Sequence, residues 1–113
     1  MSKITITPAE GTWVVRAGGA VLAETTNALK LHEDGHAPVI YFPRGDIAMA
    51  FLDRTDHSTT CATKGVASYY SIASKSRTYE NAGWSYEDPT PEAAAIKDHI
   101  AFADQDGVNV ERI

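Results

Sequence analysis

The segment from residue 66 to residue 73, VASYYSIA, alternates so regularly that it constrains the fold more than any other stretch of the chain. Successive side chains of a strand point to opposite faces, so Tyr69 and Tyr70 are expected to face opposite ways. Neither face carries a charge, which predicts that other parts of the chain cover both of them. We therefore expect a central β-strand, with Gly65 supplying the backbone freedom for a bend at its start.

Turn signals divide the rest of the chain into further strands. Gly18-Gly19 is typical of a two-residue hairpin, because both central positions of the favoured tight turn need positive φ. The polar residues 74–76 and the Asp106-Gly107 pair indicate two more turns. The expected strands cover residues 3–7, 12–17, 20–25, 28–32, 39–42, 66–73, 77–86, 101–103 and 108–110, with residues 58–61 extended.

Two segments predict short helices. In residues 44–52, Ile47 and Phe51 lie four apart on one side of a helical turn. Residues 91–99 begin with a proline after Thr90, which is a favourable N-cap residue. From the length of the chain we expect one domain over residues 1–113, and no strand–helix–strand alternation is present in it. It should be mainly β, with curved antiparallel sheets resembling a sandwich or a partly open barrel, and two short helices.

Length and charge exclude several classes of protein. A chain of 113 residues can bury a core as a single domain. The formal net charge is −5 and no basic run is present, which argues against a nucleic-acid partner. We also expect no membrane partner, since the sequence has neither a secretory signal nor a long apolar span. The single cysteine cannot form an internal disulfide and favours a cytoplasmic location.

Several linked motifs resemble those of one known family. They are Tyr41-Phe42-Pro43-Arg44, Cys61 followed by Lys64-Gly65, the tyrosine-containing strand at 67–72, and Trp84 with Tyr86, Pro89, Pro91 and Glu92. Together they resemble DUF 427, a domain-of-unknown-function family that is also labelled nucleotidyltransferase-like. The resemblance covers nearly the whole chain. It implies an all-β domain akin to the β-tent folds and carries no established activity.

The residues give little support to metal-dependent chemistry. Nucleotidyl transfer needs clustered carboxylates that hold magnesium and a loop that cradles phosphates. The nearest acidic pair is Asp53 and Asp56, and no glycine-rich phosphate loop is present. Relatives with the β-tent fold often bind zinc through two pairs of cysteines, which a single cysteine cannot supply. Residues 32–36 contain side chains that can bind a metal, namely His32, Glu33, Asp34 and His36, but the segment is more typical of a polar, glycine-containing loop. We therefore expect neither a metal site nor another cofactor.

Cys61 is the candidate for nucleophilic chemistry. His57, four residues earlier, is a candidate base, and Lys64 is placed to lower the pKa of the thiol. The alternative is that Cys61 is a small buried apolar side chain, as many free cysteines are.

The strongest pattern is a group of aromatic residues interleaved with charged ones. Aromatic walls with a few polar groups are typical of small-ligand pockets, although aromatic residues also dominate ordinary cores. The expected ligand-binding residues are Tyr41, Arg44, Lys64, Tyr69, Trp84, Tyr86 and Glu92. We expect a domain that binds a flat, anionic small molecule. An enzyme that uses Cys61 as nucleophile or general acid, and a structural or protein-interaction module, are the alternatives.

Overall fold

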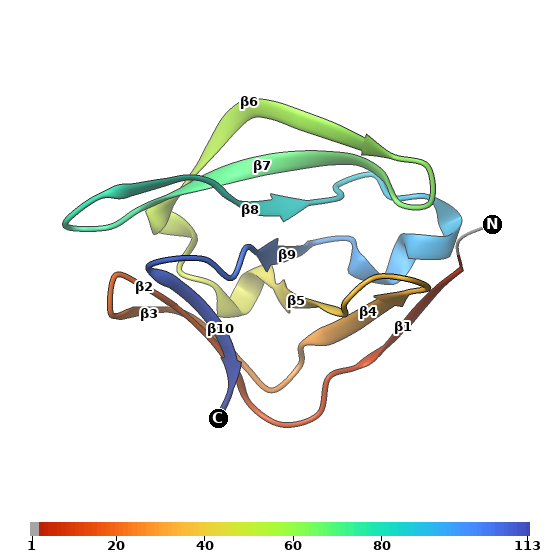
Figure 1. Cartoon of the computed structure of the whole chain (residues 1–113), viewed down its shortest axis with the longest axis horizontal. Helices are drawn as coiled ribbons and strands as arrows, with labels where there is room; N and C mark the ends of the chain where they lie inside the picture. The colour runs from red at the N-terminus through yellow and green to blue at the C-terminus, as the bar shows by residue number, and fades with distance from the viewer. Residues whose placement is uncertain (1–2) are drawn as a thin grey trace.

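Ten antiparallel strands make up most of residues 3–113, the part of the chain that the computed structural model describes (Figure 1). Seven strands form one sheet in the order β1-β4-β5-β9-β8-β7-β6, and three form a second sheet in the order β10-β2-β3. The strands are β1 (Ile4–Pro8), β2 (Trp13–Ala17), β3 (Ala20–Thr25), β4 (Leu29–Glu33), β5 (Val39–Pro43), β6 (Leu52–Cys61), β7 (Gly65–Ala73), β8 (Thr78–Ser85), β9 (His99–Phe102) and β10 (Val108–Arg112). The predicted mainly β, antiparallel fold is confirmed, and neither sheet closes into a barrel.

The tight turns lie where the sequence predicts them. Gly18 and Gly19 join β2 to β3, with φ angles of 58° and 86° that suit glycine. The turn between β7 and β8 is closed by a hydrogen bond from the Ser74 amide to the Arg77 carbonyl at 3.0 Å. Gly65 begins β7 with a φ of 112°, and a Cβ there would lie 3.3 Å from the Asp88 carbonyl oxygen. A side chain at position 65 would therefore be strained by the backbone conformation and would lie in tight contact with the Asp88 carbonyl.

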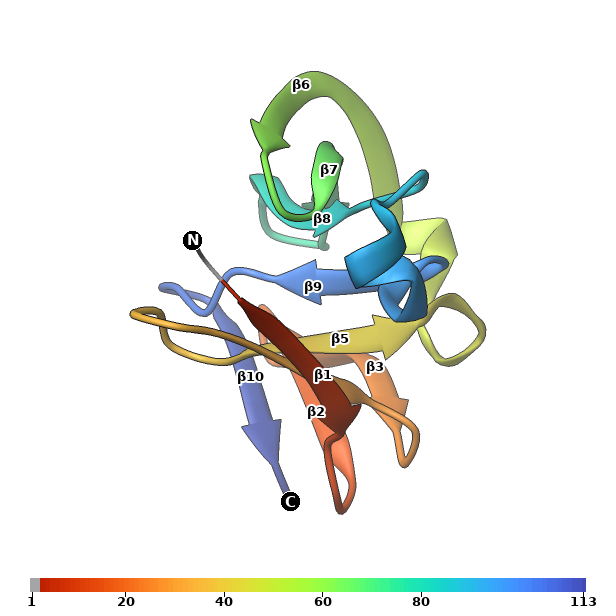
Figure 2. The same cartoon turned by 90° about the vertical axis from the view of Figure 1, so that its right-hand side faces the viewer.

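The seven-stranded sheet is strongly curved, and Figure 2 shows β6 arching over β7. Two irregularities in strand register accompany the curvature. The pairing of β6 with β7 shifts between Arg54 and Ser58, and the pairing of β7 with β8 shifts between Tyr70 and Ile72. Bulges of this kind bend a strand and increase its twist. The curved sheet therefore has a concave face that side chains line.

Each face of the large sheet carries its own apolar cluster. The cluster shared with the three-stranded sheet includes Val15, Leu22, Phe42, Tyr70, Ile72, Ile100, Phe102 and Val108. The cluster on the concave face comprises Leu31, Tyr41, Ala67, Tyr86 and Ala101, together with Ala93 and Ile96 of the 3₁₀ helix η3 (Pro91–Ile96). Tyr70 belongs to the first cluster, whereas Tyr69 packs against the second. Both faces of β7 are thus covered at Tyr69 and Tyr70, as its alternation predicts, whereas Val66 near its start is exposed.

The prediction of one helix over residues 44–52 is wrong. The segment instead forms two single turns of 3₁₀ helix, η1 (Arg44–Asp46) and η2 (Met49–Phe51). Between them, Ile47 has extended backbone angles and forms an antiparallel bridge with Ala23 of β3. A backbone hydrogen-bonded to another strand cannot continue a helix. Residues 53–56, which follow the expected helix and belong to none of the expected strands, lie within β6.

The second expected helix begins where the sequence predicts and ends earlier. η3 starts at Pro91, but it is a 3₁₀ helix that ends at Ile96. His99, expected as the last helical residue, is the first residue of β9. The helix has already ended at Lys97, whose ψ of 139° is not helical, and Asp98 has a φ of 65°. The hydroxyl of Thr90 does not cap the helix but donates to the Thr63 carbonyl at 2.6 Å. The start of η3 is therefore tied to the turn between β6 and β7.

The helical segments are all short. Within residues 3–113, none has the length and apolar character that crossing a membrane requires.

Candidate ligand-binding site

A row of side chains crosses four strands of the large sheet on its concave face. Tyr41 on β5 lies opposite Ala101 on β9, Ala101 lies opposite Trp84 on β8, and Trp84 lies opposite Tyr69 on β7. Directly opposite residues share a face of the sheet. The rings of Tyr69 and Trp84 are 6.5 Å apart between centroids and inclined by 37°. The small Ala101 side chain thus separates two aromatic groups, which leaves space above it.

A pocket of about 560 Å³ opens over this part of the concave face. It joins β4, β5, β7, β8 and the turn that follows β6. Its lining residues are Leu31, Glu33, His36, Ala37, Val39, Tyr41, Cys61, Lys64, Tyr69, Trp84 and Tyr86. The structure therefore brings together six of the nine residues that the sequence singles out.

An ion pair between Glu33 and Lys64 provides the charges of the pocket. The Lys64 ammonium lies 3.1 Å from Glu33 Oε1, and each side chain is only 13% exposed. The Thr63 hydroxyl donates to the other carboxylate oxygen at 3.2 Å. The hydrogen bond from Lys64 lowers the pKa of Glu33. Burial opposes the charged form of Lys64, but the Glu33 carboxylate outweighs it and raises the pKa of the ammonium. Both groups are charged at neutral pH.

The Cys61 thiol lies beside this pair in a polar environment. Its sulfur is 3.2 Å from the Thr63 hydroxyl oxygen. Partial burial disfavours the thiolate, whereas the backbone amides of Thr63 and Lys64 and the charge of Lys64 favour it. The Thr63 hydroxyl favours it as well when its single proton points to the sulfur instead of to Glu33. The net result is a pKa of Cys61 below the ordinary value for a thiol. Cys61 is half-buried and lines the pocket, so it is not simply a core side chain.

Two of the tyrosines remain protonated at neutral pH. Burial raises the pKa of the Tyr41 phenol, which is the larger effect, and burial also raises the pKa of Tyr86. The Lys64 ammonium lies 5.9 Å from the centre of the Tyr86 ring, which is within the range of a cation–π contact. These phenols can donate hydrogen bonds to a bound molecule.

Arg44 lies outside the pocket, on the opposite side of the sheet. Its guanidinium donates to the Tyr70 hydroxyl at 3.0 Å and to the Ser85 hydroxyl at 3.3 Å. It also forms an ion pair with Glu87 at 3.1 Å. Tyr70 and Ser85 each neighbour a pocket residue along the strand, and adjacent side chains of a strand face opposite ways. Arg44 therefore cannot hold the same anion as Lys64.

His57 and Glu92 also lie outside the pocket. His57 is exposed on β6, and its ring packs edge-on against Tyr69 at 4.5 Å between centroids. It lies four strand residues from Cys61, a rise of about 13 Å, which is too far for a base. Glu92 is exposed in the first turn of η3, where an acidic side chain complements the positive end of the helix.

Glu33 is a pocket residue that the sequence pattern does not indicate. Glu33 ends β4, and the sequence assigns it to a polar loop because it precedes Asp34 and Gly35. Its partner is 31 positions away, so no local pattern connects the two. The one signal in the sequence is Lys64, a lone basic residue next to a buried strand. A lysine that is partly buried needs an acidic partner, but the sequence does not show which residue provides it.

Asp53 and Asp56, the acidic pair that nucleotidyl transfer would require to hold magnesium, are not part of a cluster of metal-binding side chains in the part of the chain that the structure describes. Asp53 and Asp56 are both exposed on β6. Within residues 3–113, no group of three or more His, Cys, Asp or Glu side chains is placed to hold a metal ion.

Comparison with known proteins agrees with the resemblance in the motifs. No curated protein matches the sequence. A family model described as "Domain of unknown function (DUF427)" matches residues 5–112, which include every residue of the pocket and all of both sheets except Ile4. The chain therefore belongs to the DUF427 family.

Proposed function

We propose that this protein binds a small molecule with a flat body and an acidic group in the pocket on the concave face. The observation that carries the proposal is the combination of an aromatic wall with one half-buried ion pair in the same pocket. Ligand sites are usually concave, mostly apolar, and supplied with a few fixed polar groups. The pocket volume of about 560 Å³ lies within the range of such sites, roughly 300–1,000 Å³.

The aromatic wall supports a flat ligand. Trp84 and Tyr69 are partly exposed, so their rings are available to a molecule that enters the pocket. Tyr86 lies under the Lys64 ammonium and is largely buried. A flat body can stack on the exposed rings, and the Tyr86 phenol can donate to one of its polar atoms.

Lys64 supports an acidic group on the ligand. The ammonium has three donors, and Glu33 Oε1 accepts one of them. An incoming carboxylate or phosphate can accept another, in a site where low exposure strengthens charge-assisted hydrogen bonds. Glu33 sets a limit on this attraction, because it neutralises the lysine and repels a second anion. The proposed ligand is therefore an anion whose stacking contributes much of its affinity.

Tryptophan fluorescence gives a direct test. The Trp13→Phe variant leaves Trp84 as the only tryptophan, and a panel of flat carboxylates, flat phosphates and their neutral amides is then titrated. We expect some of the anions to change the Trp84 emission. Lys64→Ala should weaken them about tenfold to a hundredfold, because one charge-assisted hydrogen bond contributes about 1–3 kcal/mol.

Two controls make the result decisive. Lys97→Ala removes an exposed lysine outside the pocket and should leave affinity unchanged. The double variant Glu33→Gln with Lys64→Met removes both charges together, and thermal unfolding shows whether it is folded. Equal binding of anions and neutral amides would contradict the acidic group. No binding by any flat molecule would favour a structural or protein-interaction module whose aromatic residues serve only the core.

A second candidate function is an enzyme that uses Cys61 as nucleophile or general acid. It is favoured by the position of the thiol in the pocket, beside Thr63 and Lys64, and by its lowered pKa. Lys64 is the group available to assist, since His57 is too far away. The cytoplasmic location that we propose would keep the thiol reduced. Finding that Cys61→Ser binds the same ligand but leaves it chemically unchanged, whereas wild type converts it, would establish this candidate over simple binding.

A further inference from the structure

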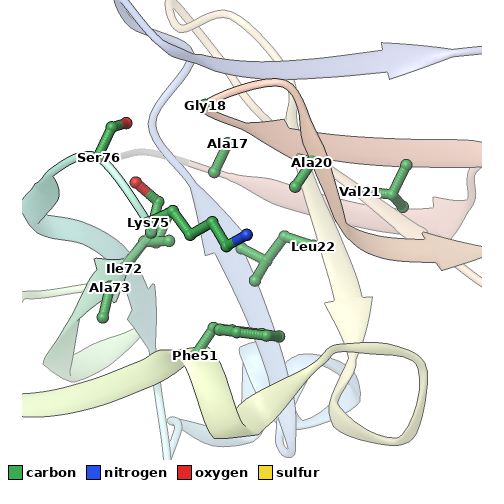
Figure 3. Close-up of a pocket in the computed structure, with 11 residues that line it drawn as sticks. Ala17, Gly18, Ala20, Val21, Leu22, Phe51, Ile72, Ala73, Lys75 and Ser76 are labelled. Carbon is green, nitrogen blue, oxygen red and sulfur yellow. The ribbon is translucent and has the colours of Figure 1, made fainter.

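A second pocket, of about 410 Å³, opens at the edge between the two sheets (Figure 3). The β2–β3 hairpin forms one wall, the end of β7 and its turn form another, and Phe51 of η2 completes the opening. The lining residues are Ala17, Gly18, Ala20, Val21, Leu22, Phe51, Ile72, Ala73, Ser74, Lys75 and Ser76. It shares no residue with the pocket on the concave face.

The walls of this second pocket are mostly apolar, and the polar residues all lie in the β7–β8 turn. Leu22 and Ile72 belong to the main core and form its inner end. Val21 and Phe51, at the opening, are 52% and 54% exposed, which is unusual for side chains of their size. A single exposed apolar residue needs no explanation, but two of them at the opening of one apolar pocket indicate a binding site.

Lys75 is the one charged residue among the eleven that line the pocket. Figure 3 shows its side chain extending from the β7–β8 turn across the opening toward the β2–β3 hairpin. Lysine often covers apolar surface with its aliphatic stem and keeps its ammonium at the edge. No salt bridge within residues 3–113 includes Lys75. The pocket thus presents an apolar interior and a positive charge without a carboxylate partner.

We propose that this second pocket binds a small amphipathic anion, with an aliphatic body between the sheets and a carboxylate at the Lys75 ammonium. Apolar walls can take up the aliphatic part, and the lysine complements the charge that remains at the opening. A protein partner fits less well, because a stable interface uses about 20–30 residues on each side and eleven line this opening. This site is independent of the function proposed for the concave face.

Octanoate is a suitable probe, with 1-octanol as a neutral molecule of the same chain length. Each is titrated into the full-length protein labelled with nitrogen-15, and backbone amide shifts are recorded. Octanoate should shift the amides of residues 20–22 and 73–76, and leave those around Trp84 unchanged. Shifts confined to the concave face, or no shifts below the concentration at which octanoate aggregates, would overturn the proposal.

Three variants test the two parts of the site. Lys75→Gln should weaken octanoate about two- to fivefold, as expected for an exposed ion pair, and leave octanol unaffected. Lys97→Gln, another exposed lysine, is the matched control and should change neither. Ala20→Phe adds a ring from an exposed hairpin position and should abolish binding of both molecules.

Three further results would each contradict the proposed anion site. Equal affinity of octanoate for wild type and Lys75→Gln would overturn the proposal of an anion. Unchanged binding to a folded Ala20→Phe variant would place the probe elsewhere. Amide shifts at residues 20–22 that depend on protein concentration, without any probe, would show that a second copy of the chain covers this opening instead.

Discussion

The Lys64 ammonium and the Glu33 carboxylate, 3.1 Å apart, join two strands that three other strands separate in the same sheet. Glu33 ends β4, and Lys64 lies in the turn before β7. In a flat sheet these strands would be four spacings of about 4.8 Å apart, or about 19 Å. The pair forms because the sheet curves, and it therefore connects opposite sides of the concave face.

Breaking this pair should destabilise the protein more than removing both charges. Lys64→Met leaves the Glu33 carboxylate half-buried without its partner, and we expect a loss of about 1–3 kcal/mol in the free energy of unfolding. The double variant Glu33→Gln with Lys64→Met should recover part of that loss, because no unpaired charge remains. Urea unfolding measures both. A double variant that is no more stable than Lys64→Met would show that the carboxylate reaches water on its own.

The pair also predicts how stability depends on pH. The pKa of Glu33 is lower in the folded protein than in the unfolded chain, so the unfolded chain binds the proton more readily. Its contribution is present above the unfolded value, about 4.3, and is lost as pH falls through the folded value. The pKa of Lys64 is raised, so its contribution is present below about 10.4 and is lost as pH rises through the folded value.

Comparison of wild type with Glu33→Gln isolates this effect from the other carboxylates. The difference in unfolding free energy between the two proteins should be largest near neutral pH. It should shrink in acid, as Glu33 is protonated, and in strong alkali, as Lys64 loses its proton. A difference that is constant across this range would contradict the ion pair.

The thiol should react as a partly activated cysteine. Burial opposes ionisation, but the Thr63 hydroxyl and Lys64 lower the pKa of Cys61 overall. Alkylation rate against pH should therefore give an apparent pKa below the reference value of about 8.5. Thr63→Val and Lys64→Met should each raise it, while His57→Ala should leave it unchanged. A thiol that reacts only after unfolding would assign Cys61 to the core.

Arg44 should matter for stability and not for the pocket. Arg44→Met removes hydrogen bonds to Tyr70 and Ser85 and an ion pair with Glu87. We expect a loss of about 1–2 kcal/mol in the free energy of unfolding, because the network is only partly buried. Any flat anion that is found to bind through its effect on Trp84 fluorescence should bind Arg44→Met as tightly as it binds wild type. A loss of affinity comparable to that of Lys64→Ala would mean that the two faces of the sheet are coupled.

Much of the fold could be predicted because its signals are local. The alternation around Tyr69 and the glycines at 18 and 19 depend only on neighbouring residues, and the structure agrees with both. A turn at 74–76 also brings the strands of Tyr69 and Trp84 side by side, but their direct pairing depends on the shift in register between Tyr70 and Ile72. Four aromatic pocket residues could be named for this reason.

The incorrect predictions concern residues whose conformation or position depends on a distant part of the chain. Ile47 and Phe51 have helical spacing, yet Ile47 is held extended by its bridge to Ala23. Arg44 follows the strand that contains Tyr41, and only the strand order, in which β5 pairs with β9 and β9 with β8, decides which face of the sheet it reaches.

The sequence by itself determined the strand periodicity, the turns and the aromatic character of the site, because these depend on residues close together in the chain. Only the tertiary structure decided that Glu33 is the partner of Lys64, and that the opening beside Lys75 lies between the two sheets. Strand order and sheet curvature bring these groups together. Both result from the packing of residues far apart in sequence, which no local pattern encodes.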